Sequence, residues 1–237
     1  MEINIKETAQ EEIRLFISSH PITNPLLFYL NSSDFFIPVC VIQREYSQWL
    51  QLIYQTLIEI NESYSVLFVL LIPRVNLFPR YNNVGVGGTF DRLHCGHYSL
   101  IQTALFTSSS HLAIAITGDS LLHSKQNYEL IHSFTTRQNQ IIDLLHTINK
   151  YYQIPPYTIS QINQPEGTST TDPTLDCLIV SEETQNTISF INDKRIMNGL
   201  QPLHSITINL ILTNDGSKFS SSTLRSRERL QNNSTQN

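Results

Sequence analysis

The sequence predicts an α/β fold in which a parallel sheet is covered by helices on both faces. Short apolar runs alternate with longer segments of helical periodicity over residues 81–237. Such alternation is typical of parallel strands joined by helical crossovers. The runs at 113–116 and 175–180 are apolar throughout, apart from Asp176, as expected for central strands covered on both sides.

The elements of this region follow one another in a simple order. Strands are expected at 84–88, 111–117, 157–161, 175–180 and 205–212, and helices at 97–106, 136–151 and 184–197. A further helix begins after Lys218. Because open parallel sheets bind ligands beyond the carboxyl ends of their strands, we expect a site there.

Residues 1–80 are expected to form a separate small α/β domain ahead of a domain at 81–237. Strands are predicted at 26–30 and 66–72, with a helix over 46–60 whose apolar residues recur at helical spacing. The Pro-, Arg- and Asn-containing stretch at 73–83 marks the boundary. No motif assigns chemistry to the first domain, so a scaffold or an interaction surface is expected.

Composition limits the classes of function. With 237 residues, 40% of them hydrophobic, the chain can bury one good core and a small second one. A formal charge of -5 argues against nucleic-acid binding, which needs a basic face. The chain has three cysteines, an odd number, which indicates a reducing compartment, the cytoplasm. The apolar run at 66–72 is too short to span a bilayer and the start lacks a secretion signal, so no membrane association is expected.

The first motif runs from Val84 to His97 and reads VGVGGTFDRLHCGH. Gly87 and Gly88 allow a phosphate to approach the backbone, and the amides and dipole of the following helix attract negative charge. His94 and His97 are three residues apart, so both imidazoles lie on one side of that helix and can donate to phosphoryl oxygens.

A second motif lies far downstream, at Lys218–Arg225. Three serines between two cations open a helix there and offer hydroxyls and amides to β- and γ-phosphates: Ser220, Ser221 and Ser222. Two phosphate-binding helix starts predict one triphosphate between them. The alternative for any one of these serines is a plain helix N-cap.

Ordinary structural roles stay open for the first motif as well. Paired glycines also make tight turns, and an isolated histidine is often a satisfied core or surface residue. A zinc site is a third alternative, but no Glu follows His94 in a zincin pattern and no third ligand is apparent. Asp91, close to the phosphate loop, can instead fix the turn by bonding backbone amides.

Four blocks together resemble a known family. They lie at 87–97, 119–125, 180–184 and 218–225. The region of about residues 83–230 is similar to the phosphopantetheine adenylyltransferases of the eukaryotic and archaeal type, within the HxGH nucleotidylyltransferase superfamily. The first and last blocks are shared across the superfamily. The Ser-Glu-Glu-Thr run at 181–184, with Asn192 and Arg195 after it, resembles this subfamily rather than the nicotinamide-mononucleotide or choline-phosphate enzymes.

The resemblance implies a Rossmann-like fold and attack by the 4'-phosphate of phosphopantetheine on the α-phosphorus of ATP. In this scheme His97 stabilises transition-state charge, His94 assists at the ATP phosphates, and Lys125 bridges the two anions. Thr89, Lys125 and Glu182 would contact the acceptor. The ATP-binding set would be Gly87, Gly88, Thr89, Phe90, His94, His97, Arg195, Lys218, Ser220, Ser221, Ser222 and Arg225.

The same resemblance implies ATP as a substrate, with Mg²⁺ held chiefly by the triphosphate rather than by a protein metal site. It is compatible with association with other enzymes of coenzyme A biosynthesis. Structural alternatives remain for single residues. Lys125 can be a solvated surface residue, Glu182 and Glu183 can be first-turn helix acids, and Arg195 can make a surface salt bridge.

The chain departs from the family pattern at two places. The loop at 164–173 keeps only Gly167 and Pro173 of the usual Asp-x-x-Gly-Pro-x-Gly-x-x-Pro, and Phe134 replaces a usual tyrosine. Both departures are expected to affect substrate affinity more than the type of reaction. No second P-loop is present, so a kinase activity is not expected.

Rival functions follow from the same residues. One is another transferase of the superfamily, with a different phosphorylated acceptor or with CTP. A class I aminoacyl-tRNA synthetase also uses paired histidines, but this chain has no room for a tRNA-binding body. The third is a non-catalytic nucleotide-binding or scaffold protein.

Overall fold

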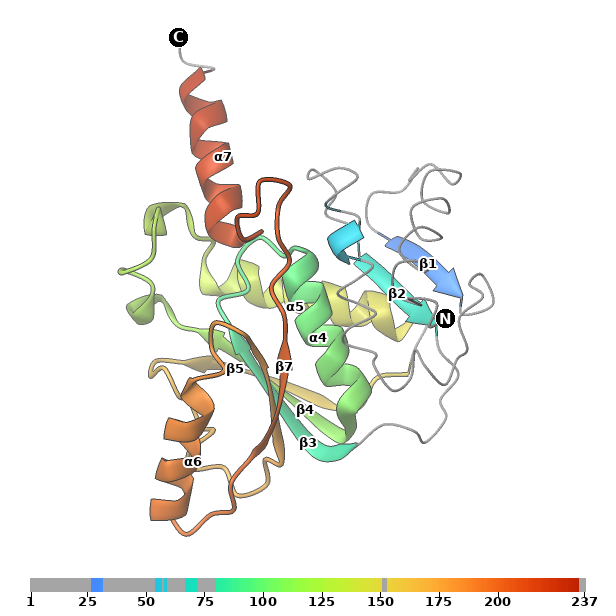
Figure 1. The fold of residues 1–237 in the computed structure, drawn as a ribbon, viewed down its shortest axis with the longest axis vertical. Helices are drawn as coiled ribbons and strands as arrows, with labels where there is room; N and C mark the ends of the chain where they lie inside the picture. The colour runs from blue at the N-terminus through green and yellow to red at the C-terminus, as the bar shows by residue number, and fades with distance from the viewer. Residues whose placement is uncertain are drawn as a thin grey trace, which may run out of the picture.

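The computed structural model describes residues 27–31, 54–56, 58, 67–71, 80–150 and 153–234. Its main body is a five-stranded parallel sheet in the order β5-β4-β3-β6-β7 (Figure 1). The strands are β3 (Tyr81–Gly88), β4 (Ser108–Thr117), β5 (Tyr157–Ile162), β6 (Cys177–Ser181) and β7 (His204–Ile208). The predicted Rossmann-like α/β fold is confirmed.

The order of the strands reverses beside β3. The chain moves outward from β3 to β4 and β5, and then returns to β6 and β7 on the other side. The carboxyl ends of β3 and β6 therefore meet where the connections diverge, which is where open parallel sheets bind their ligands.

Four helices accompany the sheet: α4 (Cys95–Thr107), α5 (Phe134–Asn149), α6 (Thr187–Met197) and α7 (Ser221–Ser234). They match the expected helices to within a few residues. The last strand is shorter than the expected 205–212. Its extension leaves the ladder because the N–H of Leu210 donates to the Glu182 carboxylate at 3.1 Å and Leu212 pairs with Lys218.

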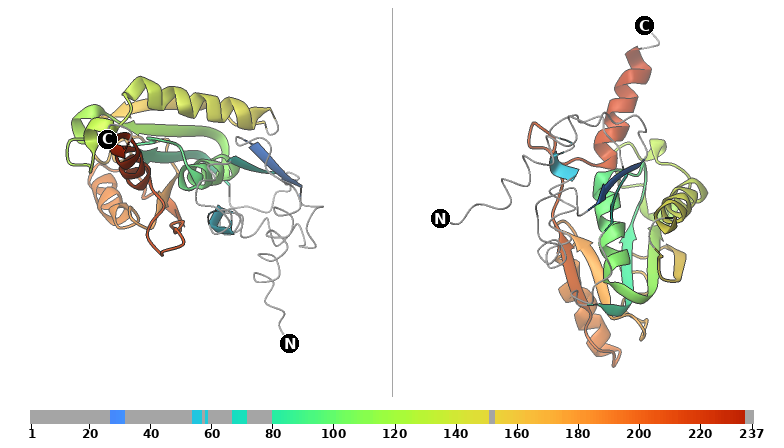
Figure 2. Two further views of the ribbon diagram at one scale, coloured as in Figure 1. Left: turned by 90° about the horizontal axis from the view of Figure 1, so that it is seen from above. Right: turned by 90° about the vertical axis from the view of Figure 1, so that its right-hand side faces the viewer.

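Helices cover both faces of the sheet (Figure 2). Val86, Ile114 and Ile179 point to one face and share a core with residues of α4 and α5. Leu178 and its neighbour Leu175 point to the other, where Ile191 of α6 packs on them. The expectation of helices on both faces is therefore confirmed.

Helix α4 lies at the centre of the molecule. Eleven of its 13 residues are buried, so no face of the helix is in contact with solvent. Thr107, a polar member of the helix, bonds locally, since its Oγ1 donates to the Thr103 carbonyl at 2.8 Å. Because α4 is enclosed, its amino end is held rigidly at the carboxyl edge of the sheet.

The amino-terminal region contributes a second sheet and part of the main core. Strands β1 (Leu27–Asn31) and β2 (Leu67–Leu71) pair in parallel, so the strands expected at 26–30 and 66–72 are confirmed. Tyr54 and Ile58 are fully buried in the same core as α4. The rest of the helix expected at 46–60 lies outside the described residues. The division of the chain at residue 80 stays a prediction, and this core extends across it.

Within the described ranges, none of the helices combines the length and apolarity that crossing a bilayer requires.

Candidate functional site

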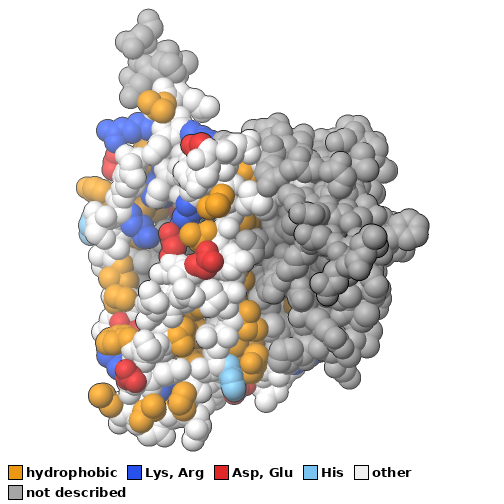
Figure 3. Space-filling model, viewed as in Figure 1, with side chains coloured by type: hydrophobic (Ala, Val, Ile, Leu, Met, Phe, Trp, Pro, Cys, Tyr) orange, Lys and Arg blue, Asp and Glu red, His pale blue; other side chains and the backbone are white. Residues whose placement is uncertain are grey.

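The two motifs come together at the carboxyl end of β3, next to the start of α4 and the start of α7. Between β3 and α4 the loop is tightly wound, with positive φ angles of 53° at Phe90 and 47° at Arg92. This conformation costs a residue with a side chain about 1–2 kcal/mol, and such strain gathers at functional sites. On this face of the molecule, Lys and Arg side chains gather below α7 beside acidic ones (Figure 3).

The two histidines lie against each other at the start of α4. Their ring centroids are 4.0 Å apart. His94 caps the helix, since its Nδ1 accepts from the Gly96 N–H at 3.2 Å. In the neutral ring the proton is therefore on Nε2, where it can be donated to a ligand. A Cβ added at Gly96 would lie 3.0 Å from Cε1 of His94, so a side chain there would press on the imidazole.

Both imidazoles are neutral at neutral pH. Burial, together with the charges on His97 and Lys218, holds the pKa of His94 well below its usual range. Burial also lowers the pKa of His97 to about 4, opposed by Asp91 and assisted by Lys218. Nδ1 of His97 is buried and has no partner among the described residues. A buried polar atom without a partner is expected where a ligand completes the site.

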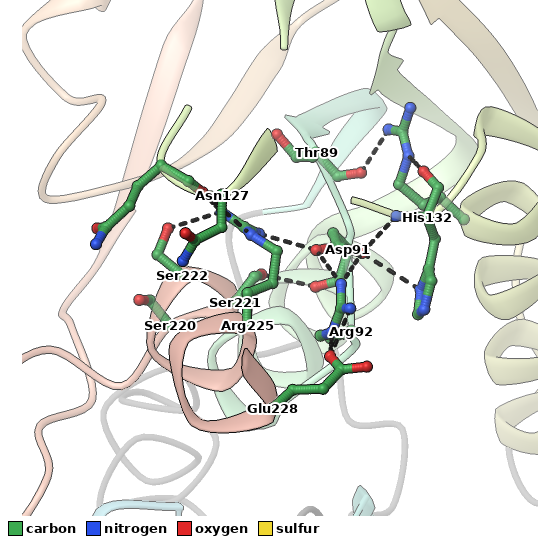
Figure 4. Close-up of polar contacts among 12 residues, drawn as sticks. Thr89, Asp91, Arg92, Asn127, His132, Ser220, Ser221, Ser222, Arg225 and Glu228 are labelled. Carbon is green, nitrogen blue, oxygen red and sulfur yellow. Dashed lines mark hydrogen bonds and ion pairs between the residues drawn. The ribbon is translucent and has the colours of Figure 1, made fainter. Parts of the chain in front are cut away.

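The carboxylate of Asp91 joins the two motifs (Figure 4). It is fully buried and accepts hydrogen bonds from the Arg92 guanidinium at 2.8 and 3.0 Å, and from the His132 N–H at 3.1 Å. Arg225 of α7 donates to it at 2.8 Å, and the Asp91 carbonyl accepts from Ser221 Oγ at 2.6 Å. We call these five residues the Asp91 cluster. Asp91 accepts from one backbone amide, that of His132, as its structural alternative predicted. Most of its hydrogen bonds, however, come from the cations Arg92 and Arg225.

Arg225 is held by bonds inside the protein. It is buried, and besides Asp91 its guanidinium donates to the Gln126 carbonyl at 2.9 and 3.3 Å and to Ser222 Oγ at 3.0 Å. These bonds position α7. A direct contact of Arg225 with ATP stays a prediction.

The serines of the second motif are also held by the protein. Ser220 Oγ accepts from the Thr223 N–H at 3.3 Å, so it caps α7 as the structural alternative proposed. Ser221 Oγ donates to the Asp91 carbonyl, and Ser222 Oγ accepts from the Arg225 guanidinium. Within the described part of the chain, however, the backbone N–H groups of Ser221 and Ser222 have no hydrogen bond. At the positive end of a helix such groups bind anions, so the main chain is the phosphate-binding part of this motif.

Lysines supply positive charge on the same side. Lys218 pairs with Glu183, and it is close enough to both histidines to lower the pKa of each. Partial desolvation, then the Arg225 and Lys218 cations, lower the pKa of Lys125, and Glu183 opposes them. The Lys125 side chain has no hydrogen bond or ion pair to the residues described. The two lysines thus lie close enough for the charge of Lys218 to influence Lys125.

Thr89 is positioned by an arginine that the sequence reasoning missed. Arg137 of α5 is fully buried and donates to the carbonyls of Thr89 and Thr117, both at 2.8 Å, and to Asp119 at 2.9 Å. It therefore ties the carboxyl ends of β3 and β4 together. A single arginine in a polar helical segment carries no sequence signal for this role.

Among the remaining predicted residues, Gly87 is exposed and Gly88 half-buried at the end of β3. The ring of Phe90 is fully buried, and a Cβ on Gly88 would lie 3.2 Å from it. Phe90 thus packs under the loop, with its ring centroid 5.4 Å from that of His97. Glu182 is exposed and bonded to the loop after β7, and its contact with an acceptor stays a prediction.

Arg195 is enclosed by backbone carbonyls. Its guanidinium is buried and donates to the carbonyls of Ser169 at 2.7 Å, Asp172 at 2.8 Å and Gln201 at 2.7 Å. These bonds fix the loop at 164–173, the segment that departs from the family pattern, and hold it against α6. A contact of Arg195 with ATP stays a prediction.

No three His, Cys, Asp or Glu side chains among the described residues lie close enough to hold a metal ion. The Asp91 carboxylate, which influences the pKa of His97, is already occupied by cationic and N–H donors.

Comparison with known proteins gives consistent matches. A family model described as cytidylyltransferase-like matches residues 86–227. The phosphopantetheine adenylyltransferase of Pyrococcus furiosus is 37% identical over 146 residues, 62% of this chain and 88% of that protein. That of Thermococcus gammatolerans is 35% identical over 148 residues, which is 61% of this chain and 88% of that protein. The Saccharomyces cerevisiae enzyme of the same name is 30% identical over 132 residues, which is 56% of this chain and 42% of that protein.

The Gly96→Ala substitution should separate polyphosphate binding from stability. Alanine favours the helix by about 1 kcal/mol, but its methyl group displaces the His94 ring and removes a cap worth about the same. We therefore expect the free energy of unfolding in urea to change by less than about 1 kcal/mol. Calorimetric affinity for inorganic tripolyphosphate should fall severalfold. Unchanged affinity in a folded variant would show that the His94 ring does not serve the site.

The depressed pKa of His97 predicts a pH-dependent contribution to stability. As the pH falls from 6.5 to about 4, the unfolded chain takes up a proton at this residue and the folded chain does not, so the native state loses stability. A His97→Gln variant lacks this loss. Thermal melts of both proteins between pH 7 and 4 should show the parent losing more stability on acidification. Parallel curves would mean that His97 titrates normally in the folded protein.

Proposed function

The chain belongs to the cytidylyltransferase-like family, and from this premise we propose that it transfers the adenylyl group of ATP to 4'-phosphopantetheine, yielding dephospho-coenzyme A and pyrophosphate. One observation carries the proposal. The buried Asp91 carboxylate brings the histidine motif and the serine motif to one place, which supports binding of one polyphosphate by both helix starts. The names of the archaeal and yeast relatives support the choice of donor and acceptor.

The proposed reaction needs no nucleophile from the protein. An oxygen of the 4'-phosphate attacks the α-phosphorus of ATP, and the bond from that phosphorus to the β-bridging oxygen breaks, so pyrophosphate leaves with the bonding electrons. Phosphoryl transfer of this kind depends on positioning and charge stabilisation. The site has the groups for both tasks, since it offers neutral imidazole donors, two lysines and free helix amides.

Each group has a distinct proposed task. His97 donates to the oxygens of the reacting phosphorus, where negative charge builds up. His94, through its Nε2 proton, holds the adjacent phosphates. The free amides of Ser221 and Ser222 and the Lys218 cation bind the leaving pyrophosphate. Lys125, whose pKa is lowered by neighbouring cations, offsets the charge of the incoming acceptor phosphate beside the hydroxyl of Thr89.

Neutral histidines suit this chemistry. An imidazolium would bind both ground-state anions strongly, whereas a neutral donor held in a fixed position gains most when charge develops in the transition state. The depressed pKa of His97 and the fixed tautomer of His94 support this assignment.

We propose that Mg²⁺ enters with ATP, bound by triphosphate oxygens and water. The described residues fit that arrangement, because they offer no cluster of carboxylates and the nearest one, Asp91, is fully bonded. The ion would neutralise phosphate charge, and the residues above would orient the reactants. Two free buried thiols, Cys95 and Cys177, support a reducing, cytoplasmic location.

The proposal is tested by comparing acceptors. The protein is incubated with ATP or CTP and with phosphopantetheine, nicotinamide mononucleotide or choline phosphate, and pyrophosphate release is measured. Release only with ATP and phosphopantetheine is expected. Pyrophosphate release with another pair would show that the protein catalyses the reaction of a different member of the superfamily. No release with any pair would indicate a non-catalytic nucleotide-binding protein.

The matched control is His97→Ala, which removes the donor but no positive charge at neutral pH. Turnover should fall by about 100- to 10,000-fold with little change in ATP affinity, because the lost interaction acts mainly in the transition state. Turnover equal to that of the parent would refute the role given to His97.

A further inference from the structure

A short helical turn of the amino-terminal region, residues 54–56 and 58, lies between α4 and the loop ahead of α7 (Figures 1 and 2). We call it the Tyr54 turn. Tyr54 and Ile58 are fully buried in the main core. The Tyr54 hydroxyl accepts from Gln102 Nε2 at 2.7 Å, and its ring lies 6.2 Å from that of Tyr98. Both partners belong to α4, the helix that begins with the two histidines.

The other side of the turn contacts the second motif. Gln55 Nε2 donates to the Leu212 carbonyl at 3.0 Å, and Gln55 Oε1 accepts from the Leu212 N–H at 2.8 Å. One carboxamide thus bonds both backbone groups of a single residue, as a neighbouring β-strand would. No other side chain among the described residues bonds Leu212 in this way.

Leu212 is rigidly connected to Lys218. The two residues pair in an antiparallel bridge, closed by a turn in which the Thr213 N–H donates to the Ser217 carbonyl at 2.7 Å. The N–H of Phe219 then donates to the Ile211 carbonyl at 2.9 Å. We call residues 211–220 the Lys218 loop. Because its internal bonds are short and numerous, fixing Leu212 also fixes the position of Lys218.

The Lys218 loop meets the first motif directly. The ring of Phe219 is buried and lies edge-on to His94, with centroids 5.6 Å apart. The next residue, Ser220, caps α7. Any displacement of this loop would therefore move a cation, a contact of a site histidine and the start of the second phosphate-binding helix together.

We propose that the Tyr54 turn holds the Lys218 loop against the start of α4, and that Gln55 is a positioning residue for the polyphosphate site. The amino-terminal region thus completes the geometry of the site, although none of its described residues touches the reacting atoms. The proposal rests on the proposed function only in taking the polyphosphate to be that of ATP.

The test compares the parent with Gln55→Ala in the full chain. Hydrogen exchange measured by mass spectrometry reports how often the Lys218 loop opens, and calorimetry with MgATP reports affinity. Loss of both bonds to Leu212 should speed exchange across residues 211–219 and raise the Kd for ATP by about three- to tenfold. The KM for phosphopantetheine should change by less than about twofold, because the residues proposed to contact the acceptor lie outside this loop.

Gln201→Ala is the control, because Gln201 is exposed and its side chain has no hydrogen bond to the described residues. It should behave as the parent in all three measurements. A second variant, Gln55→Glu, keeps the acceptor for the Leu212 N–H but loses the donor to its carbonyl, so its effects should have the same direction. This variant provides the test if Gln55→Ala fails to fold.

Parental exchange in the Lys218 loop together with parental ATP affinity in the Gln55 variants would overturn the proposal. Faster exchange without a change in ATP affinity would also overturn it, since the contact would then be structural only. The exchange measurement does not depend on catalysis. An inactive parent would therefore count against the proposed function, while Gln55-dependent exchange and ATP binding would still support the positioning role.

Discussion

The buried carboxylate of Asp91 is the constraint on which the site depends. A carboxylate without solvent is costly unless charged donors surround it, and here two arginines and a backbone N–H do so. One arginine lies next to it in the sequence and the other lies in α7, 134 residues away. Satisfying one buried charge therefore requires the two phosphate-binding segments to come together. The same requirement holds the Arg225 guanidinium inside the protein.

The site separates positive charge from hydrogen-bond donation. The buried histidines stay neutral, the cations that a triphosphate needs are two lysines, and the amides at the start of α7 are neutral donors. Buried arginines, by contrast, serve the protein: Arg137 joins two strand ends, Arg195 holds a loop, and Arg225 holds α7. A planar guanidinium with several fixed donors suits such bonding to carbonyls and carboxylates. Donors with fixed positions then require little rearrangement during the reaction.

The sequence predicted the sheet, its helices and the meeting of the two motifs, because strand ends of a parallel sheet share one edge. It did not predict the roles of Arg195 and Arg225. An arginine in a helix has the same local pattern whether its guanidinium meets a phosphate or a carbonyl, and only its distant partners decide. The roles of Tyr54 and Arg137 likewise depend on distant partners, which are α4 for Tyr54 and the ends of two strands for Arg137. Ser220 showed the converse, since its local pattern already offered the capping role that the structure gives it.

The most direct test of the account is a double-mutant cycle between Asp91 and Arg225, read out as MgATP affinity by calorimetry. The variants are Asp91→Asn, Arg225→Gln and the two combined. Each single change removes one charge of the buried Asp91–Arg225 pair, and the combined change removes both. If Asp91 holds the two segments together, the losses should be non-additive, with a coupling energy of about 1–3 kcal/mol. Losses that add to within about 0.5 kcal/mol would contradict it.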